Sequence, residues 1–296
     1  MYNEPAVKNV ILTRLRARQE RERLQRQLIP EDEDFAETIR VKLHHRLDST
    51  QYWNFCRCGN EDFYRTCKDC GKVETYKYRC NIKWCPRCQW RITETRKKVL
   101  ALWSMKIKQP KHLILTQKNF PILTRRKIKM HNVAFAKLRR TTVFEKVLGG
   151  CRSVEITNES KGWHLHSHCL LDVRWLDMPE ISRIWGKLVG QEFAIVKVQD
   201  VRDNDYLKEI CKYVVEGSEL AKWPAEHILE FVLAVKGLRF FSAFGSLAAS
   251  APNIRRELRE NKPPPADCEC GGHNFVFEDE LSSVLHEIAR LERKRR

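Results

Sequence analysis

The sequence lacks several patterns that would assign it to a common class. It has no apolar run near the roughly 18 residues that a membrane-spanning helix requires. It has no charged start followed by an apolar segment and a cleavage site, which is the pattern of a secretory signal. It contains no internal repeat and no long low-complexity tract. These absences argue against a membrane, secreted or repeat protein, and we expect a cytoplasmic chain with no membrane partner.

Acidic residues are in deficit. Asp and Glu number 38 against 55 Lys and Arg, which gives a formal net charge of +17 and a sequence pI near 9.5. Such an excess of positive charge is typical of a protein that neutralises phosphates. A nucleic acid is therefore the expected partner, because the rival, an anionic membrane surface, has no apolar anchor in the chain.

Composition divides the 296 residues into four predicted parts. Residues 1–48 form a basic helical N-terminal arm, which either packs loosely on the body or contacts DNA. Residues 49–98 form a zinc-binding module, and residues 99–250 form the main domain. Residues 251–296 form a linker, marked by three consecutive prolines, and a basic C-terminal tail.

Cysteine is the residue type that carries the first chemical signal. The chain has 12 cysteines, and seven of them lie within residues 56–88. Close cysteine pairs in a chain without a secretory signal more often hold zinc than form disulfides. The motifs Cys67-x-x-Cys70 and Cys85-x-x-Cys88 are separated by 14 residues, close to the spacing of paired thiolates in a tetrahedral zinc site. We predict a structural zinc ion at these four residues.

Seven cysteines are one short of two sites with four thiolates each. The other three of this cluster are Cys56, Cys58 and Cys80. A second zinc would need one more ligand, from His44, His45 or the tail motif "CECGGH". The candidate ligands of a separate site in the tail are Cys268, Cys270 and His273.

The main domain alternates predicted strands and helices. The predicted strands cover residues 111–119, 151–160, 162–173 and 192–201. The predicted helices cover residues 91–100, 177–190 and 205–220, with another at residues 278–296 in the tail. A short polar turn joins the second and third strands, which favours an antiparallel hairpin and argues against a purely parallel sheet.

The stretch "GWHLHSHCLLD", residues 162–172, has a histidine at every second position. Successive side chains of a strand alternate between faces, so His164, His166 and His168 share one face. Three imidazoles in this pattern form either a satisfied polar patch or, as the pattern favours, a metal site. Glu155, in the preceding strand, is either an exposed residue or a carboxylate ligand across the hairpin. Such a site suits a divalent ion that polarises a phosphate oxygen.

The predicted helix "DYLKEICKYVVE" places Tyr206, Glu209 and Tyr213 on one face, with Lys212 beside Tyr213. This stripe either packs on the sheet or supplies a nucleophile. A phenol with an ordinary pKa near 10 needs help to attack a phosphate, and Lys212 is a candidate helper. A metal ion and a tyrosine together are what transesterification of a phosphodiester requires.

Taken in order, these motifs resemble the rolling-circle replication initiators of small plasmids, within the HUH endonuclease superfamily. The resemblance covers roughly residues 67–250. The segments similar to the family are "CNIKWCPRCQWRITETR" for its cysteine-rich part, "HLILTQKN" for its first motif, "HLHSH" for its metal motif, "EICKYVV" for its nucleophile motif and "GLRFFSAFGSL" for its closing segment.

The resemblance implies an α+β fold, in which residues 99–250 form an HUH nicking and joining domain with a five-stranded antiparallel sheet flanked by helices. It also implies a requirement for Mg²⁺ or Mn²⁺. By the resemblance, His166 and His168 are metal ligands, His164 is a further one, and Glu155 is the acidic ligand.

The attacking tyrosine of the family corresponds to Tyr213, and Glu209 stands where some initiators activate water at termination. Two positions depart from the family pattern. Ser167 replaces a residue that is usually hydrophobic, and Glu216 stands where many members have a lysine.

The implied activity is that of a site-specific DNA endonuclease and strand transferase. It nicks single-stranded origin DNA, keeps the 5′ end as a phosphotyrosine, and rejoins strands at termination. The implied partners are origin DNA, single-stranded or extruded as a hairpin, and a host or plasmid helicase and polymerase. Two alternatives remain: a single-strand transposase of the same superfamily, and a non-catalytic zinc-dependent DNA-binding regulator.

Overall fold

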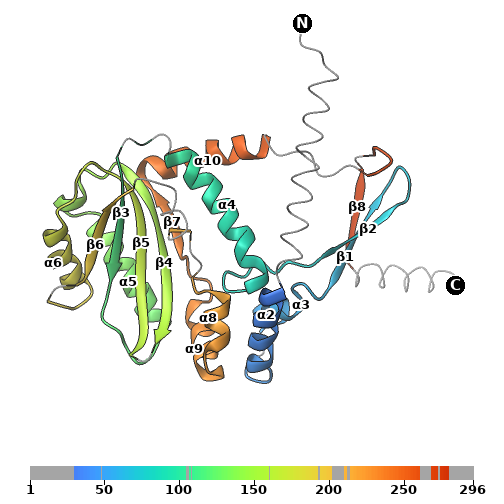
Figure 1. The fold of residues 1–296 in the computed structure, drawn as a ribbon, viewed down its shortest axis with the longest axis horizontal. Coiled ribbons are helices and arrows are strands. Elements are labelled where there is room, and N and C mark those ends of the chain that lie inside the picture. The colour runs from blue at the N-terminus through green and yellow to red at the C-terminus, as the bar shows by residue number, and fades with distance from the viewer. Residues whose placement is uncertain are drawn as a thin grey trace, which may run out of the picture.

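A five-stranded antiparallel sheet forms the largest unit of the protein (Figure 1). The computed structural model describes residues 30–47, 49–104, 107, 109–159, 161–192, 194–201, 210–211, 214–260, 268–272 and 274–279. The strands of the large sheet are β3 (Pro110–Thr116), β4 (Gly149–Glu159), β5 (Gly162–Asp172), β6 (Val196–Asp200) and β7 (Phe241–Phe244), in the order β6-β3-β5-β4-β7. The predicted α+β class and the five-stranded antiparallel sheet are thus confirmed.

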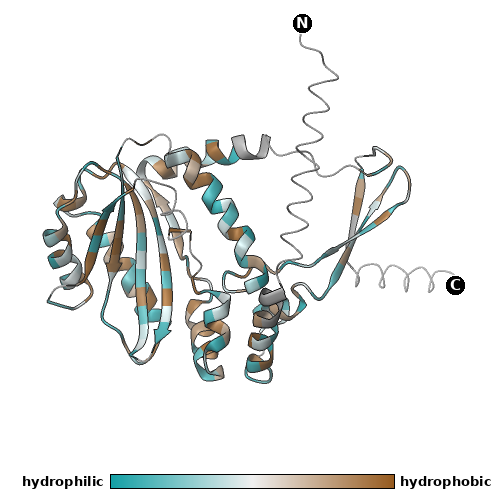
Figure 2. Cartoon of the chain, viewed as in Figure 1, coloured by the Kyte–Doolittle hydropathy of each residue, from teal (hydrophilic) through white to brown (hydrophobic). Residues whose placement is uncertain are grey.

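The β4–β5 hairpin is the centre of this sheet. Its register runs from the pair Gly149 and Asp172 to the pair Glu159 and Gly162, so the hairpin predicted from the polar turn is present. Gly162 has a φ of 91°, and a Cβ there would lie 2.7 Å from the carbonyl oxygen of Phe120. Only glycine fits this conformation and this contact without strain. Figure 2 shows hydrophilic and hydrophobic bands alternating along both strands, as expected for strands with two different faces.

Helices cover the two faces of the sheet. The described helices are α2 (Pro30–Leu43), α3 (Thr50–Arg57), α4 (Pro86–Ser104), α5 (Arg125–Leu138), α6 (Met178–Leu188), α8 (Gly217–Lys222), α9 (Ala225–Val235) and α10 (Gly245–Glu260), with a short 3₁₀ turn, η1 (Thr142–Phe144). The helices α5 and α6 pack on one face, where Phe135 and Trp185 meet Leu113 of β3. On the other face, Leu100 of α4 and Leu247 of α10 pack against Leu170 of β5. Because Leu170 and His168 share a face, α4 and α10 cover one end of the histidine face.

Local signals explain where several helices begin. The helix α6 matches the prediction for residues 177–190, since the side chain of Asp177 accepts a hydrogen bond from the backbone N–H of Glu180. Thr124 caps α5 in the same way through the N–H of Lys127. The helix α4 contains the predicted helix at residues 91–100 and starts earlier, at Pro86 within the second cysteine motif.

A second, three-stranded sheet lies at the opposite end of the molecule from the large sheet (Figure 1). It consists of β1 (Asp62–Cys67), β2 (Val73–Lys77) and β8 (Phe275–Asp279), in the order β2-β1-β8, with both pairs antiparallel. Two features cross the boundaries drawn from composition: α10 continues past residue 250, and β8 joins tail residues to the expected zinc-binding module.

Several expectations fall outside the described residues. These are most of the N-terminal arm, residues 205–209 and 212–213 of the predicted tyrosine helix, the three prolines and residues 280–296 of the predicted C-terminal helix, whose first two residues belong to the strand β8 instead. Within the part of the chain that is described, no helix has the length and apolar character needed to cross a bilayer.

Candidate functional site

The histidine face of the β4–β5 hairpin brings imidazoles and a carboxylate together. Glu155 of β4 lies directly opposite His166 of β5 in the register. The Nε2 atom of His168 lies 3.2 Å from Oε2 of Glu155, and Nε2 of His166 lies 2.9 Å from Nδ1 of His164. The period-two pattern of the strand thus has the predicted consequence, and Glu155 has the position expected for a ligand across the hairpin.

Three of these side chains have the arrangement of a metal site. Glu155, His166 and His168 offer ligand atoms that all lie within 4.8 Å of one another. Glu155 and His168 are largely shielded from solvent, with side chains 13% and 6% exposed. His164 lies at the edge of the group, where burial lowers the pKa of its imidazole and favours the neutral form. Two imidazoles and one carboxylate with open positions suit a divalent cation.

His112 is a further member of this site that the sequence analysis missed. It lies on β3, is 5% exposed, and its Nε2 atom lies 3.4 Å from Nδ1 of His168. The two rings stack with centroids 5.6 Å apart. His168 therefore presents one ring nitrogen to Glu155 and the other to His112, which is how a second group orients a metal-binding histidine. Only the pairing of β3 with β5 reveals this neighbour.

The opposite face of the hairpin holds a buried polar network beneath the histidines. Ser167 is fully buried, and its Oγ lies 2.8 Å from Nε2 of His131 and accepts a hydrogen bond of 2.7 Å from Nε of Arg152. Arg152 also donates to Oδ1 of Asn132 at 2.8 Å. Burial lowers the pKa of Arg152 to about 10 and holds the pKa of His131 well below its ordinary value. The serine that departs from the family pattern is therefore a hydrogen-bonding partner for two buried groups.

A second carboxyl group lies near the metal-site candidates. Burial raises the pKa of Glu219 on α8 to about 7, and the negative charges of Glu155 and Glu216 add to the shift. The sequence analysis did not identify Glu219, because its proximity to the hairpin follows from the packing of α8. A carboxyl group with this pKa exchanges protons near neutral pH.

The candidate nucleophile and its helpers lie outside the described residues. These are Tyr206, Glu209, Lys212 and Tyr213. The described residues on either side are held by β4 and α4. The backbone N–H of Ile156, next to Glu155, donates to the carbonyl of Val214 at 2.8 Å. The side chain of Thr93 donates to the carbonyl of Cys211 at 3.2 Å. The residue that follows Tyr213 thus lies beside the strand that carries Glu155.

A cavity of about 750 Å³ adjoins His164. His164 lines it, together with Lys118, Lys161, Gln117 and Asn119. Cationic and amide groups beside a metal-site candidate are suited to phosphate and base contacts.

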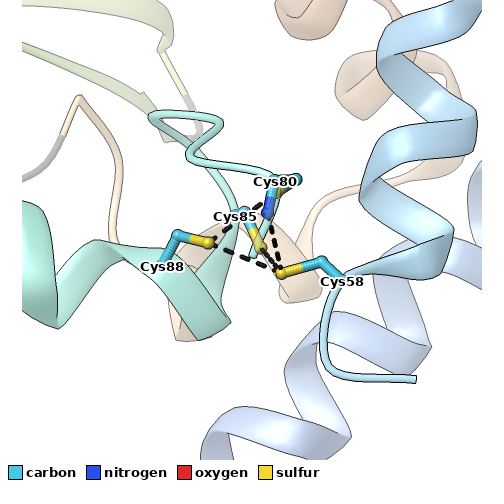
Figure 3. A group of neighbouring side chains, drawn as sticks. All are labelled: Cys58, Cys80, Cys85 and Cys88. Atoms are coloured by element: carbon cyan, nitrogen blue, oxygen red, sulfur yellow. Dashed lines mark hydrogen bonds between the residues drawn. The ribbon is translucent and has the colours of Figure 1, made fainter. Parts of the chain in front are cut away.

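The first cysteine group lies where α3, the end of the β1–β2 hairpin and the start of α4 meet (Figure 3). It consists of Cys58, Cys80, Cys85 and Cys88, whose Sγ atoms lie 3.5–3.8 Å apart in the pairs Cys58–Cys88, Cys85–Cys58 and Cys80–Cys88. A tetrahedral zinc with Zn–S bonds of about 2.3 Å separates its sulfurs by about 3.8 Å. Disulfide sulfurs are only about 2.05 Å apart, so the spacing is that of metal ligands.

Mutual hydrogen bonds among the four thiols favour a thiolate at Cys58, whereas they raise the pKa of Cys80 and of Cys85. Hydrogen bonds from the thiols of Cys80, Cys85 and Cys88 lower the pKa of Cys58. Cys58, Cys85 and Cys88 are buried. Four thiolates fill the tetrahedron and leave no position for a substrate, which is the character of a structural site.

The second cysteine group combines Cys67 and Cys70 with Cys268 and Cys270 of the tail. The spacing of the two CxxC motifs predicts that they share one site. The structure shows that they do not, so this prediction is wrong. Each motif pairs instead with cysteines from another segment, because β1 and β2 direct the two motifs to different ends of the hairpin.

The other candidate zinc ligands have different positions. Cys56 is half-buried and belongs to neither four-cysteine group. His44 and His45 follow α2, and neither appears in a metal-binding group of the described residues. His273 lies outside the described part of the chain.

Comparison with known proteins gives one match. A family model described as "Replication protein" matches residues 72–269, about two thirds of the chain. No curated protein and no solved structure matches significantly. The matched range includes the Cys58 group except Cys58 itself, and the whole of the large sheet.

Proposed function

The chain belongs to the replication protein family of small plasmids, and we propose that this plasmid replication initiator nicks one DNA strand by metal-dependent tyrosine transesterification. In the proposed reaction the phenolic oxygen of Tyr213 attacks a phosphorus atom and displaces the 3′ oxygen of the neighbouring nucleotide. The 5′ end stays on the protein as a phosphotyrosine, and the free 3′ hydroxyl primes synthesis. Reversal of this step rejoins strands when a round of replication terminates.

The observation that carries the proposal is the group formed by Glu155, His166 and His168. Its ligand atoms lie within 4.8 Å of one another on one face of the hairpin, and two imidazoles with one carboxylate suit a divalent cation, which by the family resemblance we propose to be Mg²⁺ or Mn²⁺. Such an ion supplies Lewis-acid polarisation of a phosphate oxygen. His164 extends the group towards the cavity, and His112 orients the ring of His168.

The position of Val214 supports the proposed role of Tyr213. Val214 is hydrogen-bonded to Ile156, one residue from Glu155. Because consecutive Cα atoms are about 3.8 Å apart, we propose that Tyr213, which precedes Val214 in the chain, reaches the metal-site candidates. Lys212 is the proposed helper of the phenol, and Glu209 is the proposed activator of water at termination.

The surroundings of the site suit single-stranded DNA. The adjoining cavity presents Lys118 and Lys161, and the net charge of the chain is +17. We propose that the strand enters along this cavity, with the Cys58 group holding a structural Zn²⁺ that stabilises the junction of α3 and α4. Origin DNA is the proposed partner, with a helicase and a polymerase acting after the nick.

The test is a search for the covalent intermediate. Single-stranded DNA from the replicon that encodes the protein is incubated with the chain and Mn²⁺, and adducts are separated under denaturing conditions. Tyr213→Phe should abolish the adduct and leave DNA binding nearly intact, whereas the matched Tyr206→Phe variant should form it. Mass spectrometry of the trapped peptide names the linked residue. An adduct that persists in Tyr213→Phe and disappears in Tyr206→Phe would show that the nucleophile is misassigned.

Metal dependence is tested separately. Replacement of His166 and His168 together by alanine should eliminate Mn²⁺-dependent nicking, and persistent nicking would contradict the metal assignment. A non-catalytic regulator would bind DNA but form no adduct in any variant. The family match favours a replication initiator over a transposase, because the matching model describes replication proteins.

A further inference from the structure

We propose that Cys67, Cys70, Cys268 and Cys270 form a second zinc site, which fastens the C-terminal strand β8 to the β1–β2 hairpin. This site is separate from the nicking centre and from the Cys58 group. It joins two segments that lie about two hundred positions apart in the sequence, since Cys70 and Cys268 are 198 residues apart. Neither segment alone offers four ligands.

The sulfur geometry is that of a tetrahedral thiolate site. The Sγ atoms of Cys67 and Cys270 lie 3.7 Å apart, and those of Cys70 and Cys268 lie 3.4 Å apart. All four sulfurs lie within 4.8 Å of one another. These distances are near the roughly 3.8 Å expected around zinc and far above the roughly 2.05 Å of a disulfide. Four soft thiolates select Zn²⁺ over Mg²⁺ or Mn²⁺.

Each cysteine pair lies in a tight turn that aims both sulfurs in one direction. In the hairpin, the N–H of Gly71 donates to the carbonyl of Cys67 at 2.8 Å, and Gly71 has a φ of 74°. In the tail, the N–H of Gly271 donates to the carbonyl of Cys268 at 2.8 Å, and Gly271 has a φ of 82°. Glycine follows the second cysteine in both turns because the left-handed conformation is open to it. Two turns, each closed by a glycine after its second cysteine, therefore face each other across the four sulfurs.

The two turns also approach each other closely away from the sulfurs. A Cβ on Gly272 would collide with the carboxylate of Asp69. The ammonium of Lys72 pairs with Glu269 at 2.7 Å, and the N–H of Lys68 donates to the carbonyl of Asn274 at 2.8 Å. These contacts align the tail with the hairpin and do not involve a metal ion.

Protein contacts alone hold the strand β8 only weakly against β1. The strand β8 has five residues and pairs only with β1 among the described strands, so it is an edge strand. The side chains of Lys72 and Glu269 are 39% and 85% exposed, and exposed ion pairs contribute little. A small sheet needs a hydrophobic face or a covering helix to be stable on its own, and every residue of β1 and β2 except Cys67 is exposed or half-buried. A bound zinc ion supplies the missing restraint, and metal clips that close long loops constrain the unfolded chain most.

The experiment counts zinc in the full-length chain. Elemental analysis should find two zinc ions per wild-type chain and one in the Cys268→Ser/Cys270→Ser variant. The Cys56→Ser variant is the matched control and should keep two, because Cys56 belongs to neither group. A double variant that keeps two ions, or a wild-type chain that holds only one, overturns the proposal. The ion retained in the double variant also shows that the rest of the chain has folded.

A second pair of variants establishes that the two segments share one ion. Cys67→Ser/Cys70→Ser should also retain one zinc, and so should the variant with all four changes. If the hairpin cysteines instead shared an ion with Cys85 and Cys88, the quadruple variant would hold fewer ions than the tail variant. That result would overturn the proposed pairing.

The fastening itself is measured by hydrogen exchange. The backbone amides of β8 should be protected in the wild type and should lose at least tenfold of that protection in the tail variant. A variant that has lost one zinc but retains the protection of β8 would show that the ion does not hold the strand. No DNA enters these measurements, so they are independent of the proposed nicking reaction.

Discussion

Ser167→Ala is the substitution that tests the reasoning about the sheet most directly. Its hydroxyl lies between His131 and the guanidinium of Arg152, at 2.8 and 2.7 Å, and has no access to solvent. Removal of the hydroxyl leaves a buried imidazole nitrogen and a buried charged donor with one partner fewer. A buried hydrogen bond to a charged group is worth about 1.5–3 kcal/mol, and an uncharged one about 1 kcal/mol. We therefore expect the free energy of unfolding to fall by about 2.5–4 kcal/mol.

The assay is urea unfolding followed by tryptophan fluorescence, with free zinc held constant so that metal binding does not change between variants. Ser242→Ala is the matched control. Ser242 lies on β7 opposite Arg152 in the register and is only half-buried, so we expect a change within about 0.5 kcal/mol. The Mn²⁺ affinity of Ser167→Ala should change little, because the metal-site candidates lie on the other face of the strand. A loss below about 1 kcal/mol, or a loss of metal binding without a loss of stability, would refute the network described.

Three further predictions follow from the same geometry. Burial keeps the pKa of His131 below its ordinary 6.5, so the unfolded chain binds more protons than the folded chain below that pH. The free energy of unfolding should therefore fall as the pH drops below 6.5, which urea midpoints measured from neutral pH to about pH 5 would show. The variant His131→Gln should lose less stability over this pH range. His112→Ala should weaken Mn²⁺ binding by about 10–100-fold in calorimetry while His168 stays in place, and unchanged affinity would remove His112 from the site. Cys85→Ser should lose the buried zinc ion and unfold the junction of α3 and α4, which circular dichroism at matched zinc concentration would detect; a native spectrum would contradict a structural role.

The β4–β5 hairpin shows how much of the site local sequence could predict. A period of two forces His164, His166 and His168 onto one face, and a short polar turn forces the preceding strand to run alongside them. Glu155 then had to lie within a few residues of the histidines, and the register places it opposite His166. Turn and strand geometry act over about a dozen residues, so within that range the sequence is sufficient to predict which side chains lie close together.

His112 and Glu219 show where this reasoning ended. Each reaches the hairpin from another element, β3 or α8, and neither has a distinctive motif around it. The single histidine in "KHLILT", His112, could equally lie at the surface or be buried beside His168, and nothing in the sequence around it distinguishes the two positions. Which strand lies next to β5 is decided by the packing of the whole sheet.

The sequence by itself determined the chemical character of this protein: a basic chain, cysteines in numbers that indicate metal binding, a face of imidazoles on one strand, and the α+β class. Only the tertiary structure decided which thiolates belong together. The spacing of Cys67, Cys70, Cys85 and Cys88 predicts one site, yet each motif lies beside cysteines of another segment. The ligands of a metal ion must be close in space, and the β1–β2 hairpin holds the two motifs at its opposite ends although they are close in sequence. The tail cysteines reach Cys67 and Cys70 because β8 pairs with β1, and a pairing between residues so far apart along the chain leaves no periodic trace in the sequence.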